Sequence, residues 1–196
     1  DLFVSHGYEN VSIRKIAERI EYSPAAIYGY FPSKDDIFFA LAEEGFRLLG
    51  DPGHRSEPAL QALPPLDRLR AIFRRLYQFS RDHPQYFALM FVDRSVPRIS
   101  REYERFAFVR ELKAHLAAEV QQCIDQHLLP PTVQPAVAVR LLTMSILGVA
   151  VLRLSDRMAP SEDADALAED VLNVMLAGLQ SGVPLTSTAT GVDCQN

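Results

Sequence analysis

The stretch VSIRKIAERIEYSPAAIYGYFPSK, residues 11–34, carries two short helical patterns joined by a tight turn. The first pattern repeats apolar residues at helical spacing, which predicts an amphipathic helix of about two turns whose charged residues face elsewhere. Only Glu21 and Tyr22 separate it from the second pattern, so the two helices must cross steeply, as in a helix-turn-helix. The side chains expected in the core of this unit are Ile16, Ala17, Ile20 and Ile27.

Three serines mark the expected starts of helices in and just after this stretch. Ser12 precedes the first helix and Ser23 precedes the second, where Pro24 follows at once. A serine hydroxyl in such a position caps exposed backbone N–H groups, and proline suits the first helical turn because no N–H is required there. Ser33, with Asp36 three residues later, has the pattern of a capping box and predicts the start of a further helix.

This order of elements resembles the DNA-binding domain of the tetracycline-repressor (TetR-like) family of bacterial transcriptional regulators. Gly7 and Tyr8 match the close of its first helix, residues 12–17 its second helix, residues 23–30 its recognition helix, and residues 31–34 the start of its fourth. The resemblance covers residues 2–49. It implies an all-α fold, with an N-terminal three-helix helix-turn-helix domain followed by a larger helical ligand-binding and dimerisation domain.

Breaks in the helical patterns divide the chain. Residues 50–65 contain two glycines and four prolines and form the clearest boundary. We therefore expect the helix-turn-helix domain at residues 1–50, the helical domain at residues 51–182, and a polar tail at residues 183–196. The sequence begins at Asp1 without Met, in what reads as the last turns of a helix, and we expect further residues, including a basic arm, before it.

Composition favours an all-α protein, since 48% of the 196 residues are hydrophobic and no strand-like alternation is sustained. The formal net charge of −5 argues against a protein that coats nucleic acid through bulk electrostatics, but it allows local DNA binding. Residues 11–34 hold four basic against two acidic residues, whereas residues 1–50 hold five against eight, which is unfavourable next to phosphates. Two cysteines, Cys123 and Cys194, predict no disulfide framework and suit a reducing cytoplasm.

The family pattern also implies which residues meet operator DNA. Ser12 and Lys34 would contact phosphates, and Arg14 would reach a phosphate or a guanine edge. Tyr28 would face the groove, with packing inside the domain as the alternative. The full expected set is Ser12, Arg14, Pro24, Ala25, Ala26, Tyr28, Gly29, Tyr30 and Lys34.

Three residues depart from the common family pattern. Glu21 stands where the family usually has glycine, and a non-glycine residue in a left-handed conformation costs on the order of 1 kcal/mol. The turn is therefore either strained or different in geometry. Ala26 replaces a frequent threonine and Gly29 a frequent larger side chain, so the recognition helix offers few donors. We expect thymine-methyl contacts, Arg14 and DNA shape to carry much of the specificity.

Helical spacing predicts further helices at residues 35–49, 66–81, from residue 84, and at residues 100–127, 133–154 and 161–181. The helix at 35–49 is apolar over a wide face and should touch the second domain. Half of all Phe and Tyr residues lie between residues 73 and 108, which predicts either a solid aromatic core or a cavity for a small, largely apolar or aromatic effector. The residues expected around such an effector are Phe73, Tyr77, Phe87, Phe91, Tyr103, Phe106, Arg110 and His115.

The last two helices resemble the family's dimer interface, in which each subunit contributes two helices to a four-helix bundle. Ordinary core within one chain is the alternative. The expected interface residues are Leu141, Ser145, Gly148, Leu152, Leu167, Val171, Val174 and Met175. A membrane span needs about 20 apolar residues, and Arg140 and Arg153 leave only residues 141–152 uncharged, so we expect no membrane insertion.

An enzyme is one rival hypothesis. Glu111, His115 and Glu119 share a helix face, but no third metal ligand is evident beside either pair, and solvated pairs are the simpler interpretation. We expect no catalytic residues, no metal and no cofactor. A second rival is a helical ligand-binding or scaffold protein that has lost specific DNA binding. The main prediction is a cytoplasmic homodimeric repressor that binds double-stranded operator DNA and is released by a small-molecule effector.

Overall fold

The computed structural model describes residues 2–50, 58–93, 96–97 and 107–187, and over these residues its regular elements are all helices. The all-α prediction is confirmed. The chain forms two compact units. The first combines Asp1–Asp51 with Phe79–Ala107, and the second combines Pro52–Gln78 with Phe108–Asn196.

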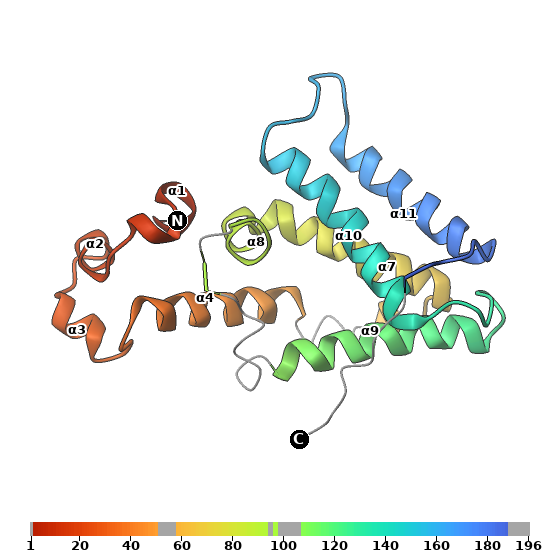
Figure 1. Ribbon diagram of the computed structural model, residues 1–196, viewed down its shortest axis with the longest axis horizontal. Coiled ribbons are helices and arrows are strands. Elements are labelled where there is room, and N and C mark those ends of the chain that lie inside the picture. Colours follow the sequence, from red (N-terminus) through yellow and green to blue (C-terminus); the bar gives the residue numbers. More distant parts are fainter. Residues whose placement is uncertain (1, 51–57, 94–95, 98–106, 188–196) are drawn as a thin grey trace. The chain divides into compact units, whose positions relative to one another are not determined.

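The first unit holds the helix-turn-helix. Its elements are α1 (Leu2–His6), the 3-10 helix η1 (Tyr8–Asn10), α2 (Ile13–Arg19), α3 (Pro24–Tyr28), α4 (Lys34–Leu49) and α8 (Pro84–Phe91) (Figure 1). Phe3, Tyr8 and Phe38 are buried together, with the ring of Tyr8 in contact with both phenylalanine rings. These contacts fix α1 against α4, beside the two crossing helices α2 and α3.

Helix α4 packs against α8 at a close crossing. A Cβ atom on Gly45 would lie 2.4 Å from Sδ of Met90 and 3.1 Å from Cδ1 of Tyr86, so only glycine fits without a shift. One residue further, the rings of Phe46 and Phe91 meet edge to face at 6.1 Å. The sequence predicts that this helix touches the second domain, at residues 51–182, but the structure places its partner α8 in the first compact unit. The packing of α8 on α4 extends that unit beyond the predicted residues 1–50 to include Phe79–Ala107.

The second unit is built on long helices. They are α7 (Pro65–Asp82, whose last turn belongs to the first unit), α9 (Ala107–Asp125), α10 (Pro135–Leu154) and α11 (Ala164–Gln180), and the short α6 (Pro58–Gln61) precedes them. Helices α10 and α11 form an antiparallel pair side by side (Figure 1). Leu142 and Ile146 of α10 and Leu172 and Leu176 of α11 are buried in the core.

Several predicted boundaries need correction. The stretch 50–65 is predicted to be a loop, but Pro58–Gln61 is helical, while residues 51–57 lie outside the described residues. The helix expected to end at residue 127 ends at Asp125, because His127 adopts a left-handed φ of 58°. Within the acidic stretch expected to cap the last helix, Asp163 is the cap, and its carboxylate accepts hydrogen bonds from the N–H groups of Asp165 and Ala166 at 2.9 and 3.2 Å.

Helix α10 is long and apolar enough, by length and composition, to cross a membrane. It also contains Arg140 and Arg153, and its buried side packs along α11. The guanidinium carbon of Arg153 lies 6.0 Å from the centroid of the Tyr77 ring, within the same unit. These contacts are typical of a helix in the core of a helical domain.

Candidate nucleic-acid interface

The helix-turn-helix is held by the caps that the sequence predicts. The N–H of Lys15 donates to the Ser12 hydroxyl at 3.2 Å, and the N–H of Ala26 donates to the Ser23 hydroxyl at 3.1 Å. Ser33 and Asp36 form a complete capping box at the start of α4. Each cap satisfies backbone donors that the first turn of a helix leaves open. The three helices therefore begin at residues fixed by local chemistry.

The turn between α2 and α3 has the left-handed geometry that the family pattern requires. Glu21 has a φ of 59°. The N–H of Tyr22 donates to the carbonyl of Ala17 at 2.9 Å, and the N–H of Glu21 to that of Glu18 at 3.4 Å, which is a Schellman ending. Of the two alternatives for this turn, strain at Glu21 is the one that holds.

Replacing Glu21 by glycine should therefore stabilise the protein. Relief of the left-handed strain is worth about 1–2 kcal/mol and the added freedom of glycine in the unfolded chain costs roughly 0.5–1 kcal/mol, so we expect a net gain of about 0.5–1 kcal/mol. The midpoint of thermal unfolding measures it. Glu18→Gly makes the same change inside α2 and should destabilise by about 1 kcal/mol. Equal losses in the two variants would contradict a strained turn.

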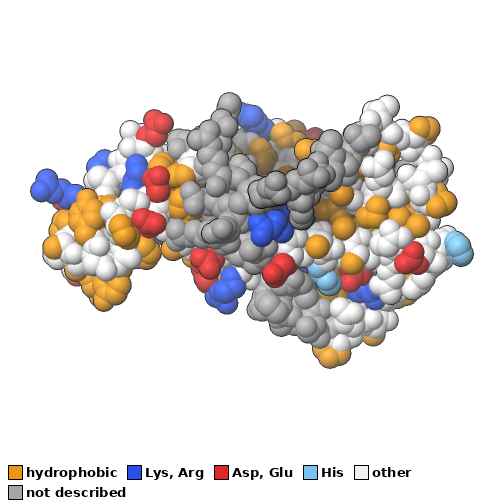
Figure 2. Space-filling model, turned by 60° about the horizontal axis from the view of Figure 1, so that its bottom comes forward, with side chains coloured by type: hydrophobic (Ala, Val, Ile, Leu, Met, Phe, Trp, Pro, Cys, Tyr) orange, Lys and Arg blue, Asp and Glu red, His pale blue; other side chains and the backbone are white. Residues whose placement is uncertain are grey.

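The residues expected to meet DNA lie at the surface of this unit. All of the expected set are exposed except Ala26 and Lys34, which are half-buried. Tyr28 is 55% exposed, so packing inside the domain does not occupy its side chain. In the space-filling view, hydrophobic side chains gather at the left-hand end, where the helix-turn-helix lies, with few Lys or Arg side chains between them (Figure 2). The surface is thus suited to apolar and shape-based contacts more than to dense phosphate binding.

Lys34 is positioned by the junction of η1 and α4. Its Nζ donates to the carbonyl of Tyr8 at 2.8 Å and lies 4.1 Å from the centroid of the Tyr8 ring. The Tyr8 hydroxyl in turn donates to the carboxylate of Asp35. Burial, and next the hydrogen bond to Asp35, raises the pKa of Tyr8 above its usual range, so the hydroxyl stays a donor. An ammonium group has three N–H donors, so this anchoring leaves donors for a phosphate.

One core prediction in this unit is wrong. Ile13, Ala17 and Ile27 form the buried cluster, with Ile16 packed against it. Ile20, expected in the core, is 51% exposed. The reason is that Ile20 is the C-cap of α2, where the chain leaves the helix, and its side chain lies on the rim of a hollow beside α4.

The residues expected around an effector are divided between the two compact units. Phe73 and Tyr77 are buried in the second unit, where the Tyr77 hydroxyl donates to Asp165 at 2.8 Å. Phe87 is buried and Phe91 half-buried in the first unit. In α9, Arg110 is exposed and His115 half-buried, while Tyr103 and Phe106 lie outside the described residues. The effector site therefore stays a prediction.

The second unit contains a buried ion pair that the sequence pattern does not predict. Arg68 and Glu119 are 6% and 7% exposed, and Nε of Arg68 lies 2.7 Å from Oε2 of Glu119. The expectation that the Glu119 pair with His115 is solvated is therefore wrong, although Nε2 of His115 does lie 3.8 Å from Glu119. Over the described ranges, His, Cys, Asp and Glu form no group of three that could hold a metal ion.

The residues expected at a dimer interface form a stripe beside the buried stripe of each helix. None of them is fully buried in the single chain, and Val174 is 69% exposed. Met144 is also exposed on α10, on the same helical face as Leu141 and Gly148, although it is not among the expected interface residues. Buried residues such as Leu142 and Leu172 hold α10 against α11. The second stripe is therefore only partly covered in one chain, with Gly148, Leu152 and Val174 exposed and the other five residues half-buried.

Comparison with known proteins agrees with this architecture. The model of the family described as "Bacterial regulatory proteins, tetR family" matches residues 1–41, and that described as "Tetracyclin repressor-like, C-terminal domain" matches residues 69–175. The HTH-type transcriptional repressor AcnR of Corynebacterium diphtheriae is 40% identical over 42 residues, which are 21% of this chain and only 22% of that protein.

Two solved structures share the fold over nearly the whole chain. The TetR family regulator PfmR of Thermus thermophilus is 21% identical, with a TM-score of 0.68 over 91% of this chain and 94% of that one. FadR of Bacillus subtilis, solved with stearoyl-CoA, is 15% identical, with a TM-score of 0.73 over 90% and 93%. Since one family model alone covers more than half of the sequence, the chain belongs to the tetR family of bacterial regulatory proteins.

Proposed function

We propose that this protein is a homodimeric transcriptional repressor that binds double-stranded operator DNA and releases it when a small, largely apolar or aromatic effector binds. The observation that carries the proposal is the capped helix-turn-helix with its Schellman turn, which holds the start of α3 at the surface. A recognition helix in the major groove presents its first residues to base edges. Here these residues are Pro24, Ala25 and Ala26.

Within this function, Ser12 and Lys34 bind phosphates, and Arg14 binds a phosphate or a guanine. Because residues 1–50 carry more acidic than basic residues, a single helix-turn-helix binds weakly, and a dimer that engages two half-sites supplies the affinity. The proposed dimer uses the apolar stripe of α10 and α11 around Val174, with the two chains forming a four-helix bundle. The protein acts in the cytoplasm, where the operator DNA is.

Effector control works through α4. This helix begins with Lys34 at the DNA-binding end and reaches the close crossing of Gly45 with Tyr86 and Met90 of α8. A ligand that displaces α8 therefore displaces α4 and, with it, the phosphate contact. Such a ligand lowers operator affinity only if it binds the two arrangements with different affinity. The aromatic residues between 73 and 108 are its proposed binding region.

The test is binding of the full chain to the DNA upstream of its own gene, measured by fluorescence anisotropy at several salt concentrations. Specific binding that weakens steeply with salt supports a regulator, and release by a candidate effector supports the repressor cycle. The FadR relative was solved with stearoyl-CoA, so acyl-CoA thioesters of several chain lengths are the first probes. Absence of specific binding at low salt would support the alternative, a helical ligand-binding or scaffold protein that has lost DNA recognition.

Arg14→Ala should weaken operator binding by about 1–3 kcal/mol if Arg14 reads a guanine. The side chain is exposed in α2, so the loss reflects a missing DNA contact and not unfolding. Anisotropy titrations with operator and with random DNA measure the effect. Arg157→Ala removes the same charge from an exposed position beyond the end of α10 and serves as the control. An equal loss of binding free energy on operator and random DNA would show that Arg14 contacts only a phosphate.

A further inference from the structure

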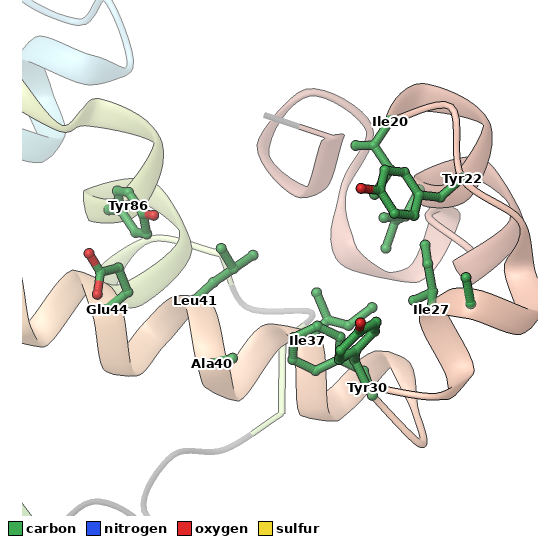
Figure 3. Close-up of a pocket in the computed structure, with 12 residues that line it drawn as sticks. Ile20, Tyr22, Ile27, Tyr30, Ile37, Ala40, Leu41, Glu44 and Tyr86 are labelled. Atoms are coloured by element: carbon green, nitrogen blue, oxygen red, sulfur yellow. The ribbon is translucent and has the colours of Figure 1, made fainter.

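The DNA-binding unit contains an apolar hollow of about 360 Å³ that none of the expected effector residues lines. It lies between the helix pair α2 and α3 on one side and α4 with α8 on the other. Figure 3 shows Ile20 and Tyr22 facing it from the turn, Ile37 and Leu41 facing it from α4, and Glu44 and Tyr86 together at its far end. Ligand pockets in proteins have volumes of about 300–1,000 Å³, so the hollow suits a small molecule.

Apolar side chains are left in water around this hollow. Ile20 and Tyr22 are both more than half exposed at its rim, although they flank the turn that organises the unit. Covering such surface is favourable in proportion to the apolar area removed from water. A ligand with an apolar body of matching size would cover Ile20, Ile37 and Leu41 at once.

The charge of the lining selects among apolar ligands. Glu44 is the charged residue of the lining, and among the residues that the structure describes no Lys or Arg lines the hollow. Arg47 donates two hydrogen bonds to the Glu44 carboxylate, at 2.6 and 2.7 Å, which lower the pKa of Glu44 and keep it ionised. A carboxylate has about four lone-pair sites, so acceptor capacity remains for a further donor. Tyr22, Tyr30 and Tyr86 add aromatic rings, whose faces attract cations.

We propose that this hollow binds a lipophilic monocation, an ammonium ion on an aromatic or alkyl body, with the ammonium group at Glu44 and Tyr86 and the apolar body between Ile20 and Leu41. Ala26 and Tyr30, which belong to the segment expected to face DNA, line the same hollow. Occupancy therefore shifts the recognition helix against α4 and weakens operator binding. This last step rests on the proposed function, whereas ligand binding itself does not.

Three probes with the same phenylbutyl body and different charges test the site: 4-phenylbutylamine, 4-phenylbutanol and 5-phenylpentanoate. Isothermal titration calorimetry on the full chain at pH 7 should rank the amine first, about tenfold tighter than the alcohol, with the carboxylate weakest. Glu44→Gln should bring the amine down to the level of the alcohol and leave the alcohol unchanged. Glu43→Gln, an exposed neighbour on α4 that does not line the hollow, should change neither.

Ala40→Leu fills the hollow from α4 and should weaken the amine and the alcohol alike by about tenfold or more, with thermal unfolding unchanged. If neither Glu44→Gln nor Ala40→Leu changed the affinity of the protein for the amine, the proposed site would be wrong. Operator titrations with and without saturating amine test the coupling: an operator affinity that falls in the native protein but not in Ala40→Leu supports it. Unchanged operator affinity with the site occupied would overturn the coupling alone, and lack of any operator binding would overturn the proposed function instead.

Discussion

Glu119→Ala should destabilise the folded protein by about 3–5 kcal/mol, because it leaves the guanidinium of Arg68 buried without its counter-ion. The pair lies in the second unit, where α7 and α9 meet, with Nε of Arg68 2.7 Å from Oε2 of Glu119. The remaining donors of Arg68 are directed at the carbonyls of Gln61 and Leu63, at 3.4 and 3.2 Å, and at the side chain of Gln122. These neutral acceptors satisfy hydrogen bonds, but none of them compensates the charge.

The measurement is the midpoint of thermal unfolding, which should fall by roughly 6–20 °C for a chain of this size. Glu111→Ala removes an exposed carboxylate from the same helix and should shift the midpoint little. The double variant Arg68→Met with Glu119→Leu removes both charges and should recover most of the loss, because replacing a buried pair by apolar residues is often neutral. Similar midpoints for Glu119→Ala and Glu111→Ala would show that the pair contributes nothing specific.

The helix-turn-helix could be predicted from sequence because its determinants are local. Each cap joins residues three apart, as Ser12 does with Lys15 and Ser23 with Ala26. The turn is equally local, since its hydrogen bonds close between Ala17 and Tyr22. The residues that determine these contacts lie within about ten positions of one another. Helical periodicity and capping patterns can be recognised over windows of that length. The all-α class and the start of α4 could be predicted for the same reason.

The features that sequence analysis missed depend on distant residues. Arg68 and Glu119 are 51 positions apart, and a charged residue on an amphipathic helix normally indicates solvent. Ile20 fits the apolar period of α2, but the helix ends there, so its side chain leaves the buried stripe. The membership of α8 in the first unit follows from its packing on α4, where Met90 and Tyr86 approach Gly45 closely. A glycine inside a helix is the one local signal that could have suggested this crossing.

The apolar stripe of α10 and α11 leads to the second large effect. Val174→Asp should convert the proposed dimer to a monomer and lower operator affinity by roughly 100- to 10,000-fold, the usual gain from linking two binding modules. Val174 is 69% exposed in the single chain, so an aspartate there is solvated in the monomer and the chain still folds. In the dimer the same carboxylate would be buried against the partner's apolar stripe without a counter-ion, which is strongly unfavourable.

Asn173→Asp is the matched control, because it adds the same charge one residue earlier, on an exposed part of α11 outside the apolar stripe. Light scattering coupled to size-exclusion chromatography reports the mass of each variant, and anisotropy reports its operator affinity. A monomeric Val174→Asp with native thermal stability and lost operator binding would tie DNA affinity to this face. If Val174→Asp instead remained dimeric with native operator affinity, the stripe would be ordinary surface. The operator affinity of a helix-turn-helix with so little positive charge would then need another explanation.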